Sequence, residues 1–367
     1  MKVALVHEFL TQFGGAERVL EVLHRIYPQA PVYTIFHDRV KTKGRYENWD
    51  VRESVLGRIP GARAHYKWYL PLMPWAVSSF DMKDYDVVIS DSSAYAKWVR
   101  VGSGTHICYC HTPTRYLWQD RDTYVANLRY PAIVKIIVKP ILSRFRRMDW
   151  EASQRVDIFI ANSREVQNRI KRYYQRNSVV LYPPVDTDFF EVAPSTSNRE
   201  YFLTGGRLEP YKHFELPILA ANKLKIPLLV FGDGTESSEL VRIAGPTVKI
   251  LGRVTDEKLR SLYQHAKAFI YPALEDAGMS MVEAMSCGTP VLAYRRGGAL
   301  EFVSEGLTGD FFDAQSVDSI VNAIADFKDE RFTSQSIRNF ALKFGVNEYR
   351  SKFEAIVSRS IQERGAP

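Results

Sequence analysis

Two glutamates, Glu275 and Glu283, stand with seven residues between them, and Gly278 lies between the two where a helix is expected to begin. The start of a helix presents unpaired backbone N–H groups and the positive end of the helix dipole, which together favour an anion such as a diphosphate. Ionised carboxylates accept hydrogen bonds from sugar and ribose hydroxyls. An anion site flanked by hydroxyl acceptors predicts a site for a nucleotide sugar.

Two cations, Arg207 and Lys212, follow the apolar run YFLT and straddle a turn that contains Pro210. Arginine can bind phosphate oxygens in a fork, and lysine supplies a mobile point charge. A pair of cations can also be a solvated surface, but open α/β sheets bind ligands at the carboxyl ends of their strands. We therefore predict that both side chains bind a diphosphate, and that no metal is required. Asp186 and Asp188 lie in a linker-like run and are not predicted to bind one.

The stretch 275–301 resembles the donor site of the retaining GT-B glycosyltransferases, specifically glycosyltransferase family 4. In that family two glutamates at this spacing precede a helix, a Gly-Thr-Pro turn, a strand and a Gly-Gly pair. The matching residues here are Gly288-Thr289-Pro290, the run VLAY and Gly297-Gly298. The family usually has an aromatic residue where this chain has Ala277, so the packing of that loop is the point at which the resemblance departs.

The resemblance implies a role for each of the residues that match the family. Glu283 would accept the ribose hydroxyls, Glu275 and the backbone near Gly278 would hold the sugar, and the donor phosphate itself would help to deprotonate the acceptor. The implied catalytic residues are His111, Arg207, Lys212 and Glu275. The implied donor-binding residues are Gly14, Gly15, Gly206, Arg207, Lys212, Arg253, Ala277, Gly278, Met279, Ser280 and Glu283.

Two features of the first half of the chain have both a structural and a functional interpretation. Gly14-Gly15 follows the strand-like run KVALVH and lacks the third glycine of a dinucleotide fingerprint, so it is either a plain turn or a loop that faces the donor diphosphate. His111 lies just past the apolar run THICYC, where it is either structural or in contact with the transferred sugar. Ser163 is expected to cap a helix.

The strings GGAERV and HTPTRYLW resemble a mannosyltransferase-like branch of the family that works in bacterial surface-polysaccharide assembly, on O-antigen or exopolysaccharide. The resemblance implies GDP-mannose as the donor and a glycan or polyprenyl-linked glycan as the acceptor. We therefore expect a retaining, metal-independent hexosyltransferase. The alternatives are a UDP-hexose donor, a GT-B phosphorylase or a sugar-nucleotide epimerase.

Short apolar runs alternate with helix-like stretches in both halves of the chain, which predicts buried parallel sheets covered by helices. The expected fold is α/β, of the GT-B type, with two Rossmann-like domains that face a central cleft. We expect an acceptor-binding domain over 1–190, a donor domain over 191–345, and a helix over 346–367 that crosses back to the first domain. The proline-containing run 182–200 is the predicted linker.

Composition and charge narrow the class of protein further. The 367 residues include three cysteines, Cys108, Cys110 and Cys287, which match no disulfide or zinc pattern and favour a reducing compartment. The N-terminal run does not read as a signal peptide, and no apolar stretch approaches the length of a membrane span. We expect a cytoplasmic protein without a nucleic-acid partner, because no known aromatic-basic motif accompanies the formal charge of +7.

The formal charge is uneven, at +9 over residues 1–190 and −2 over residues 191–367. The stretch 132–147 mixes apolar residues with Lys135, Lys139, Arg144, Arg146 and Arg147. It is either an ordinary helix interrupted by Pro140 or an element that lies on the anionic inner face of the cell membrane.

Overall fold

The computed structural model describes residues 1–63, 65–119, 132–194 and 199–365, which fold into two compact units. The first unit comprises Met1–Tyr182 together with Arg350–Pro367, and the second comprises Pro183–Tyr349. The second unit therefore begins earlier than the expected residue 191. The C-terminal segment belongs to the first unit from Arg350 onward.

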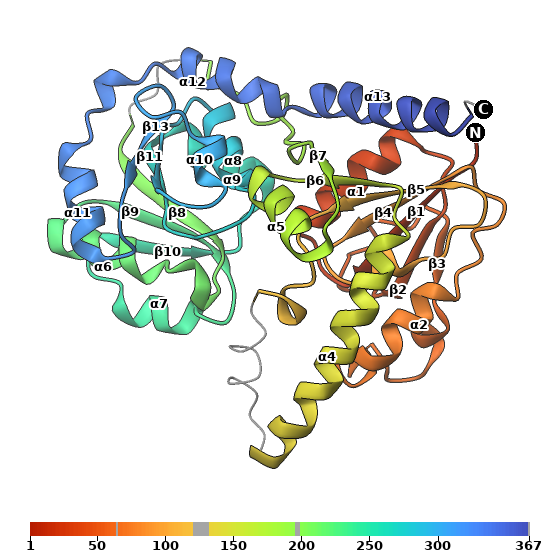
Figure 1. Cartoon of the computed structure of the whole chain (residues 1–367). Helices are drawn as coiled ribbons and strands as arrows, with labels where there is room; N and C mark the ends of the chain where they lie inside the picture. Colours follow the sequence, from red (N-terminus) through yellow and green to blue (C-terminus); the bar gives the residue numbers. More distant parts are fainter. Residues whose placement is uncertain (64, 120–131, 195–198, 366–367) are drawn as a thin grey trace. The chain divides into compact units, whose positions relative to one another are not determined.

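The first unit is built on a parallel sheet with the strand order β3-β2-β1-β4-β5-β6-β7 (Figure 1). Its strands are almost wholly buried in the centre, which is why they read as continuous apolar runs rather than as alternating ones. The strands are β1 (Val3–Leu10), β2 (Val32–His37), β3 (Val51–Glu53), β4 (Val87–Ser92), β5 (Thr105–Cys110), β6 (Ile158–Ala161) and β7 (Ser178–Val180).

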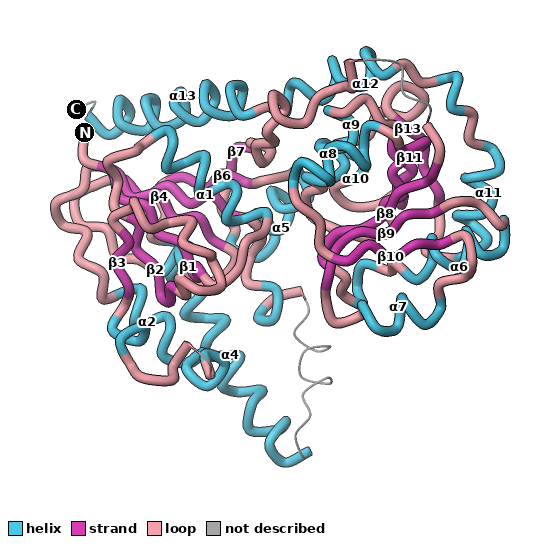
Figure 2. The backbone as a smooth tube through the Cα atoms, turned by 180° about the vertical axis from the view of Figure 1, so that it is seen from behind, coloured by secondary structure: helices cyan, strands magenta, loops and turns pink. Residues whose placement is uncertain are grey.

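The helices of this unit are amphipathic elements that cover its sheet. The helix α2 and the C-terminal part of α4 bury Met73, Val77 and Ala152 in one hydrophobic cluster with β1, β2 and β4. The helix α13 lies beside α1 in both views, and Phe353 packs edge-on against Tyr27 at the end of α1 (Figures 1 and 2). These helices are α1 (Gly15–Ile26), α2 (Met73–Ser78), α4 (Ala132–Gln154), α5 (Arg164–Tyr174) and α13 (Val346–Gly365).

The second unit repeats the architecture with the strand order β10-β9-β8-β11-β12-β13, again all parallel. Alternate side chains of the strands face opposite layers of helices. Ala268 and Ile270 of β11 join the cluster formed with α6, α7 and α11. Phe269 of the same strand packs instead on Tyr263 of α8.

The bounds of this unit's elements follow. The strands are β8 (Tyr201–Arg207), β9 (Leu228–Asp233), β10 (Val248–Gly252), β11 (Ala266–Tyr271), β12 (Val291–Tyr294) and β13 (Gly309–Phe312). The helices are α6 (Glu215–Leu224), α7 (Ser237–Ile243), α8 (Asp256–Gln264), α9 (Met279–Ser286), α10 (Ala299–Phe302), α11 (Val317–Asp326) and α12 (Ser334–Ala341).

The prediction of two α/β units with parallel sheets is confirmed. One local expectation was wrong: α4 continues through Pro140 instead of being interrupted there. The expected cap at Ser163 is present, because its hydroxyl accepts a hydrogen bond from the backbone N–H of Val166 at 3.2 Å. The side chains of Lys135 and Lys139 lie outside the described residues.

Candidate active site

The carboxyl end of β8 is shaped by glycines that a larger residue could not replace. Gly205 and Gly206 have φ angles of +151° and +144°, and Gly232 of the neighbouring β9 has +112°. A Cβ atom on Gly205 would lie 2.2 Å from the Phe231 carbonyl oxygen, and one on Gly232 would lie 1.7 Å from that of Gly206. The close approach of β8 and β9 therefore requires glycine. Arg207, the last residue of the central strand β8, is exposed.

Lys212 ends a 3₁₀ turn that follows β8, and it pairs with the predicted sugar-binding glutamate. Its Nζ lies 2.9 Å from Oε1 of Glu275, and both side chains are largely buried. A Cβ atom added to Gly206 would lie 3.8 Å from this Nζ, so the ammonium stands directly beside the glycine turn. The structure thus brings together three residues, Gly206, Lys212 and Glu275, that were predicted separately.

A buried tyrosine that the sequence analysis missed completes the setting of Glu275. The Tyr271 hydroxyl, at the end of β11, donates a hydrogen bond to Oε2 of Glu275. Burial and the adjacent carboxylate raise the pKa of Tyr271 well above its ordinary value, so the phenol stays a donor. The strands β8 and β11 are neighbours from which the chain departs in opposite directions, so this group lies at the switch point of the sheet, where open α/β sheets bind ligands.

The Gly297-Gly298 pair holds the loop of Glu275 in place. The backbone N–H of Gly298 donates to the Glu275 carbonyl at 2.8 Å. A Cβ atom on Gly298 would lie 2.5 Å from the Asp276 carbonyl, so no larger residue fits against this loop. The second glycine pair therefore positions the site through backbone contact.

The helix α9 begins where the sequence predicted, with Gly278 as its N-cap. Gly278 supplies no side-chain cap and the first turn carries no acidic residue, which is the kind of helix start that favours an anion. Ala277, Met279 and Ser280 surround this helix start and are half-buried. Glu283, one turn further along α9, is only 5% exposed, and the Tyr263 hydroxyl lies 3.5 Å from its Oε2.

Arg253 stands apart from this group in the sheet. It follows β10, which is the edge strand and is separated from β11 by β9 and β8. Its side chain is exposed. Its inclusion among the donor-binding residues remains a prediction.

In the first unit, Gly14 and Gly15 form the turn from β1 into α1, with Gly14 as the N-cap in an extended conformation. The first turn of α1 already contains a carboxylate, Glu17, which is 3% exposed. A Cβ atom on Gly14 would lie 3.2 Å from Oε2 of Glu17. This helix start differs from that of α9, because a buried anion already occupies its first turn.

His111 belongs to a buried cluster formed at the carboxyl ends of β1, β4 and β5. Its Nε2 lies 2.5 Å from Oδ1 of Asp91, whose Oδ2 lies 2.8 Å from Nδ1 of His7. Burial acts to lower the pKa of His111, but Asp91 outweighs burial and raises it above its ordinary value. The pKa of His7 is raised well above its usual range by the hydrogen bonds to Asp91 and Glu17, which outweigh burial.

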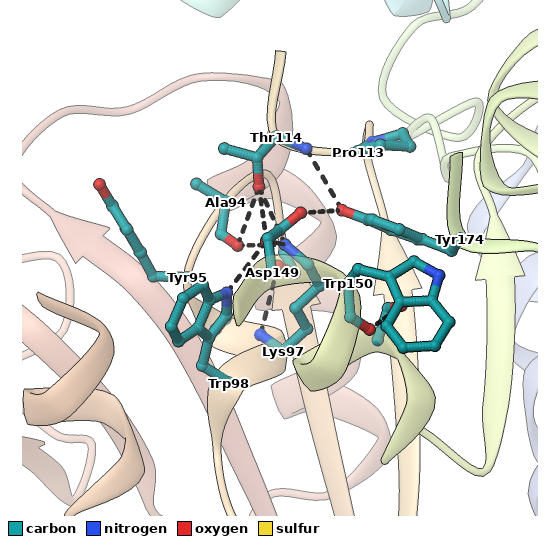
Figure 3. Close-up of polar contacts among 12 residues, drawn as sticks. Ala94, Tyr95, Lys97, Trp98, Pro113, Thr114, Asp149, Trp150 and Tyr174 are labelled. Atoms are coloured by element: carbon teal, nitrogen blue, oxygen red, sulfur yellow. Dashed lines mark hydrogen bonds and ion pairs between the residues drawn. The ribbon is translucent and has the colours of Figure 1, made fainter. Parts of the chain in front are cut away.

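The segment that follows His111 is anchored by a second buried cluster, which Figure 3 shows around Asp149 of α4. Asp149 and Lys97 form an ion pair at 2.7 Å, with side chains that are 0% and 1% exposed. Asp149 also accepts hydrogen bonds from the hydroxyl of Thr114 at 3.1 Å and the indole of Trp118 at 2.8 Å. The segment HTPTRYLW is thereby fixed to α4.

Sequence reasoning missed Tyr271, His7, Asp91 and Asp149. A usable signal was present for two of them, because His7 and Asp91 are titratable residues that closely follow the apolar runs VALV of β1 and VVI of β4. Asp149 follows the basic stretch that was interpreted as a membrane element, and nothing in the sequence marks it as buried.

Among the described residues, no group of three or more His, Cys, Asp or Glu side chains is arranged to hold a metal ion. Within the same part of the chain, no helix is both long enough and apolar enough to cross a membrane.

Two family models match the chain almost end to end. "Glycosyltransferase Family 4" matches residues 13–189, and "Glycosyl transferases group 1" matches residues 185–344. The second match contains the whole of the Lys212–Glu275 site, and the first contains His111.

Individual relatives and solved structures agree with these models. The alpha-1,3/1,6-mannosyltransferase ALG2 of Candida glabrata is 23% identical over 83% of this chain and 78% of its own length. A GDP-mannose-dependent alpha-(1-6)-phosphatidylinositol monomannoside mannosyltransferase of Mycolicibacterium smegmatis is 30% identical over 40% of this chain and 46% of its own. The structure of HepE from Anabaena with UDP-glucose superposes with a TM-score of 0.74 at 20% identity, covering 98% of this chain and 100% of that one.

Proposed function

Because the chain belongs to the GT-B glycosyltransferases, we propose that it transfers mannose from GDP-mannose to a hydroxyl of a glycan or polyprenyl-linked glycan, with retention of configuration. The observation that carries this proposal is the Lys212–Glu275 pair at the sheet's switch point, beside the uncapped start of α9. It combines a cation and backbone N–H donors for a diphosphate with a carboxylate for sugar hydroxyls. The mannosyltransferase relatives support mannose as the sugar.

The charges of the site support a reaction without a metal ion. Developing negative charge on the leaving diphosphate is stabilised by Lys212, by the exposed Arg207 and by the N–H groups at the start of α9. The Lys212 ammonium is paired with Glu275, so an incoming phosphate competes with that carboxylate. Turnover that persists undiminished in excess EDTA is the expected result, and loss of turnover restored by a divalent cation contradicts it.

The donor base is tested by thermal shift with GDP, UDP and ADP, all at the same concentration, so that the size of the shift reports relative affinity. A ligand at about 100 times its Kd stabilises the folded state by about 2.7 kcal/mol. We expect the largest shift with GDP and none with duplex DNA. A larger shift with UDP favours the second candidate, a UDP-hexose transferase, which the UDP-glucose complex of HepE supports.

Two glutamate variants separate nucleotide binding from sugar binding. Glu283→Ala should weaken binding of the free nucleoside diphosphate, because the ribose loses its acceptor. Glu275→Ala should leave that binding intact, because it releases Lys212 for the phosphates, but should slow transfer. The measurement is titration calorimetry, with the exposed Glu257→Ala on α8 as the matched control. Wild-type nucleotide affinity in Glu283→Ala contradicts the ribose assignment.

We also propose that the first unit docks on the anionic inner face of the cell membrane through α4 and the neighbouring segment 66–75. Several large apolar side chains are exposed on these two elements, which lie side by side in both views (Figures 1 and 2). They include Trp68 at 84%, Trp75 at 59% and Ile141 at 46% exposure. Aromatic side chains beside basic ones are typical of surfaces that lie in a membrane interface.

The membrane proposal is tested by flotation with anionic and neutral vesicles. Each basic residue near an anionic surface contributes about 1 kcal/mol, so neutralising Arg144, Arg146 and Arg147 together should weaken binding by roughly two orders of magnitude. Donor hydrolysis in solution should stay unchanged, because the Lys212–Glu275 site lies in the other unit. Equal flotation of the wild type and the triple variant, or none of either, refutes this docking surface.

A further inference from the structure

We propose that Asp91 is a positioning residue that fixes His111 as a cationic hydrogen-bond donor, with Nδ1–H directed at an oxygen of the bound substrate. The inference rests on the proposed function, in which His111 contacts the transferred sugar. It goes beyond that function by assigning the protonation state and the donor atom of His111, and by giving a role to two residues outside the predicted site, Asp91 and His7.

The parallel register of the sheet places these side chains together. His7 of β1 pairs with Asp91 of β4, and Asp91 pairs in turn with Tyr109 of β5. His111 follows Tyr109 by two residues, which keeps it on the same side of the chain. Each oxygen of the Asp91 carboxylate therefore meets one imidazole, at 2.8 Å for His7 and 2.5 Å for His111.

The carboxylate determines which nitrogen of His111 a ligand can use. Nε2 is occupied by Asp91, which is 1% exposed, whereas the His111 side chain is 14% exposed. Because Asp91 takes up Nε2, Nδ1 is the nitrogen that remains for a substrate oxygen. A carboxylate that accepts from one ring nitrogen in this way sets the tautomer of the other.

The charges around the ring favour the imidazolium. Besides Asp91, the carboxylate of Glu17 from α1 lies 3.9 Å from Nε2 of His7. A third carboxylate, Glu8 of β1, is 5% exposed and accepts backbone hydrogen bonds from residues 93, 94 and 96. With both imidazoles protonated, the three carboxylates still outnumber the cations, so an opposite charge is available to each ring.

The remaining neighbours of the ring do not reverse this balance. The phenol ring of Tyr109 packs edge-on against His111, and its hydroxyl donates to the Leu181 carbonyl. Arg169 of α5 binds the hydroxyl of the adjacent Thr112 at 3.3 Å and pairs with Glu165 of its own helix at 3.1 Å. The positive charge of His7 lowers the pKa of His111, while Asp91 and Glu8 raise it.

The same geometry would also suit a general base, and the two roles differ in the sign of their pH dependence. A base must be neutral and gains activity as the pH rises through its pKa. A cationic donor loses activity over the same range, because the proton on Nδ1 is the one that leaves. The inference therefore predicts a transfer rate that declines as the pH rises through the pKa of His111.

Two variants should move the pKa of His111 in opposite directions. Asp91→Asn removes the anion and should lower the pKa. His7→Gln removes the competing cation and should raise it. The measurement is the pH titration of the histidine ring nitrogens by NMR in the full chain, with His111 assigned from the spectrum of His111→Gln. Asp86→Asn is the matched control, because Asp86 is an exposed carboxylate just before the same strand.

The transfer rate as a function of pH supplies the second readout. Its alkaline limb should move to lower pH in Asp91→Asn and to higher pH in His7→Gln, while affinity for the nucleoside diphosphate stays the same. A His111 pKa that neither variant moves overturns the inference, as does a rate that rises with pH through that pKa. If the titration shifts as expected but no hexose donor is turned over, the proposed function fails while the assignment of the His111 charge stands.

Discussion

Replacing Asp149 by asparagine should destabilise the first unit more than any surface substitution, because Asp149 is fully buried and neutralises a buried lysine. Its carboxylate forms an ion pair with Lys97 at 2.7 Å and accepts a hydrogen bond from the indole N–H of Trp98 at 3.0 Å. It also accepts hydrogen bonds from the indole N–H of Trp118 and the hydroxyl of Tyr174, both at 2.8 Å (Figure 3). Asparagine keeps the shape but leaves the ammonium of Lys97 without its counter-charge.

The magnitude follows from that uncompensated charge. Removing one partner of a buried ion pair costs about 3–5 kcal/mol. With a urea dependence of roughly 2 kcal/mol/M, the midpoint of unfolding should fall by about 2 M. Lys97 retains a hydrogen bond to the hydroxyl of Thr114 at 3.0 Å, which places the expected loss toward the lower end of the range.

The distribution of tryptophan makes the assay selective for this unit. All six tryptophans lie between Trp49 and Trp150, within the first unit, so their fluorescence during urea unfolding reports on that unit alone. Glu151→Gln is the matched control, because Glu151 lies on the same helix but is 49% exposed in its pair with Arg147. An exposed pair of this kind contributes less than about 1 kcal/mol.

A double-mutant cycle isolates the ion pair itself. Lys97→Met and Asp149→Asn should each destabilise the unit, and the double variant should be more stable than the sum of the two losses indicates, by about 1–3 kcal/mol. Two results would refute the view that this pair holds the segment HTPTRYLW to α4. One is a free energy of unfolding of Asp149→Asn within ~1 kcal/mol of the wild type, and the other is losses of the two single variants that simply add in the double variant.

Three further predictions follow from other parts of the chain. Lys212→Ala should lower turnover at saturating donor by about 10²-fold, since the variant loses one positive charge that stabilises the leaving diphosphate, and wild-type turnover would disprove its role. Gly232→Ala should lower the melting temperature far more than Gly252→Ala. A Cβ atom at position 232 would lie 1.7 Å from a carbonyl oxygen, whereas one at position 252 would meet nothing within 4 Å. Similar melting temperatures of the two variants would contradict this. Since the pKa of His7 is raised, its stabilising contribution is complete below about pH 6.5, its unfolded value, and is lost as the pH rises through the folded value. The free energy of unfolding of the first unit, measured by fluorescence, should fall on alkalinisation, and His7→Gln should flatten that dependence.

The predictability of this fold differs between long and short elements. Buried strands such as β1, β4 and β11 contain the apolar runs VALV, VVI and AFIY, so their sequence alone indicates a parallel sheet. The strands β3, β7 and β13 span three or four residues and lie at sheet edges, where too few residues are present to form a pattern. They were not predicted.

The candidate site was predictable one residue at a time but not as a set of contacts. Lys212 and Glu275 follow different strands, and only the adjacency of β8 and β11 makes them an ion pair. His7 and Asp91 are 84 residues apart in the chain, and they become partners through the register of β1 with β4. Contacts of this kind depend on strand order, which spacing within a motif does not contain.

The helix α13 begins in the second unit and ends in the first, so the first unit is assembled from two segments on either side of the second. During synthesis, a ribosome must therefore finish the entire second unit before Phe353 and Val357, both buried, can join the first. Until then, the earlier segment exposes the apolar surface that these two residues later cover. Apolar surface exposed in this way is where nascent chains aggregate or recruit chaperones. Expression of residues 1–182 alone would make that interim state permanent.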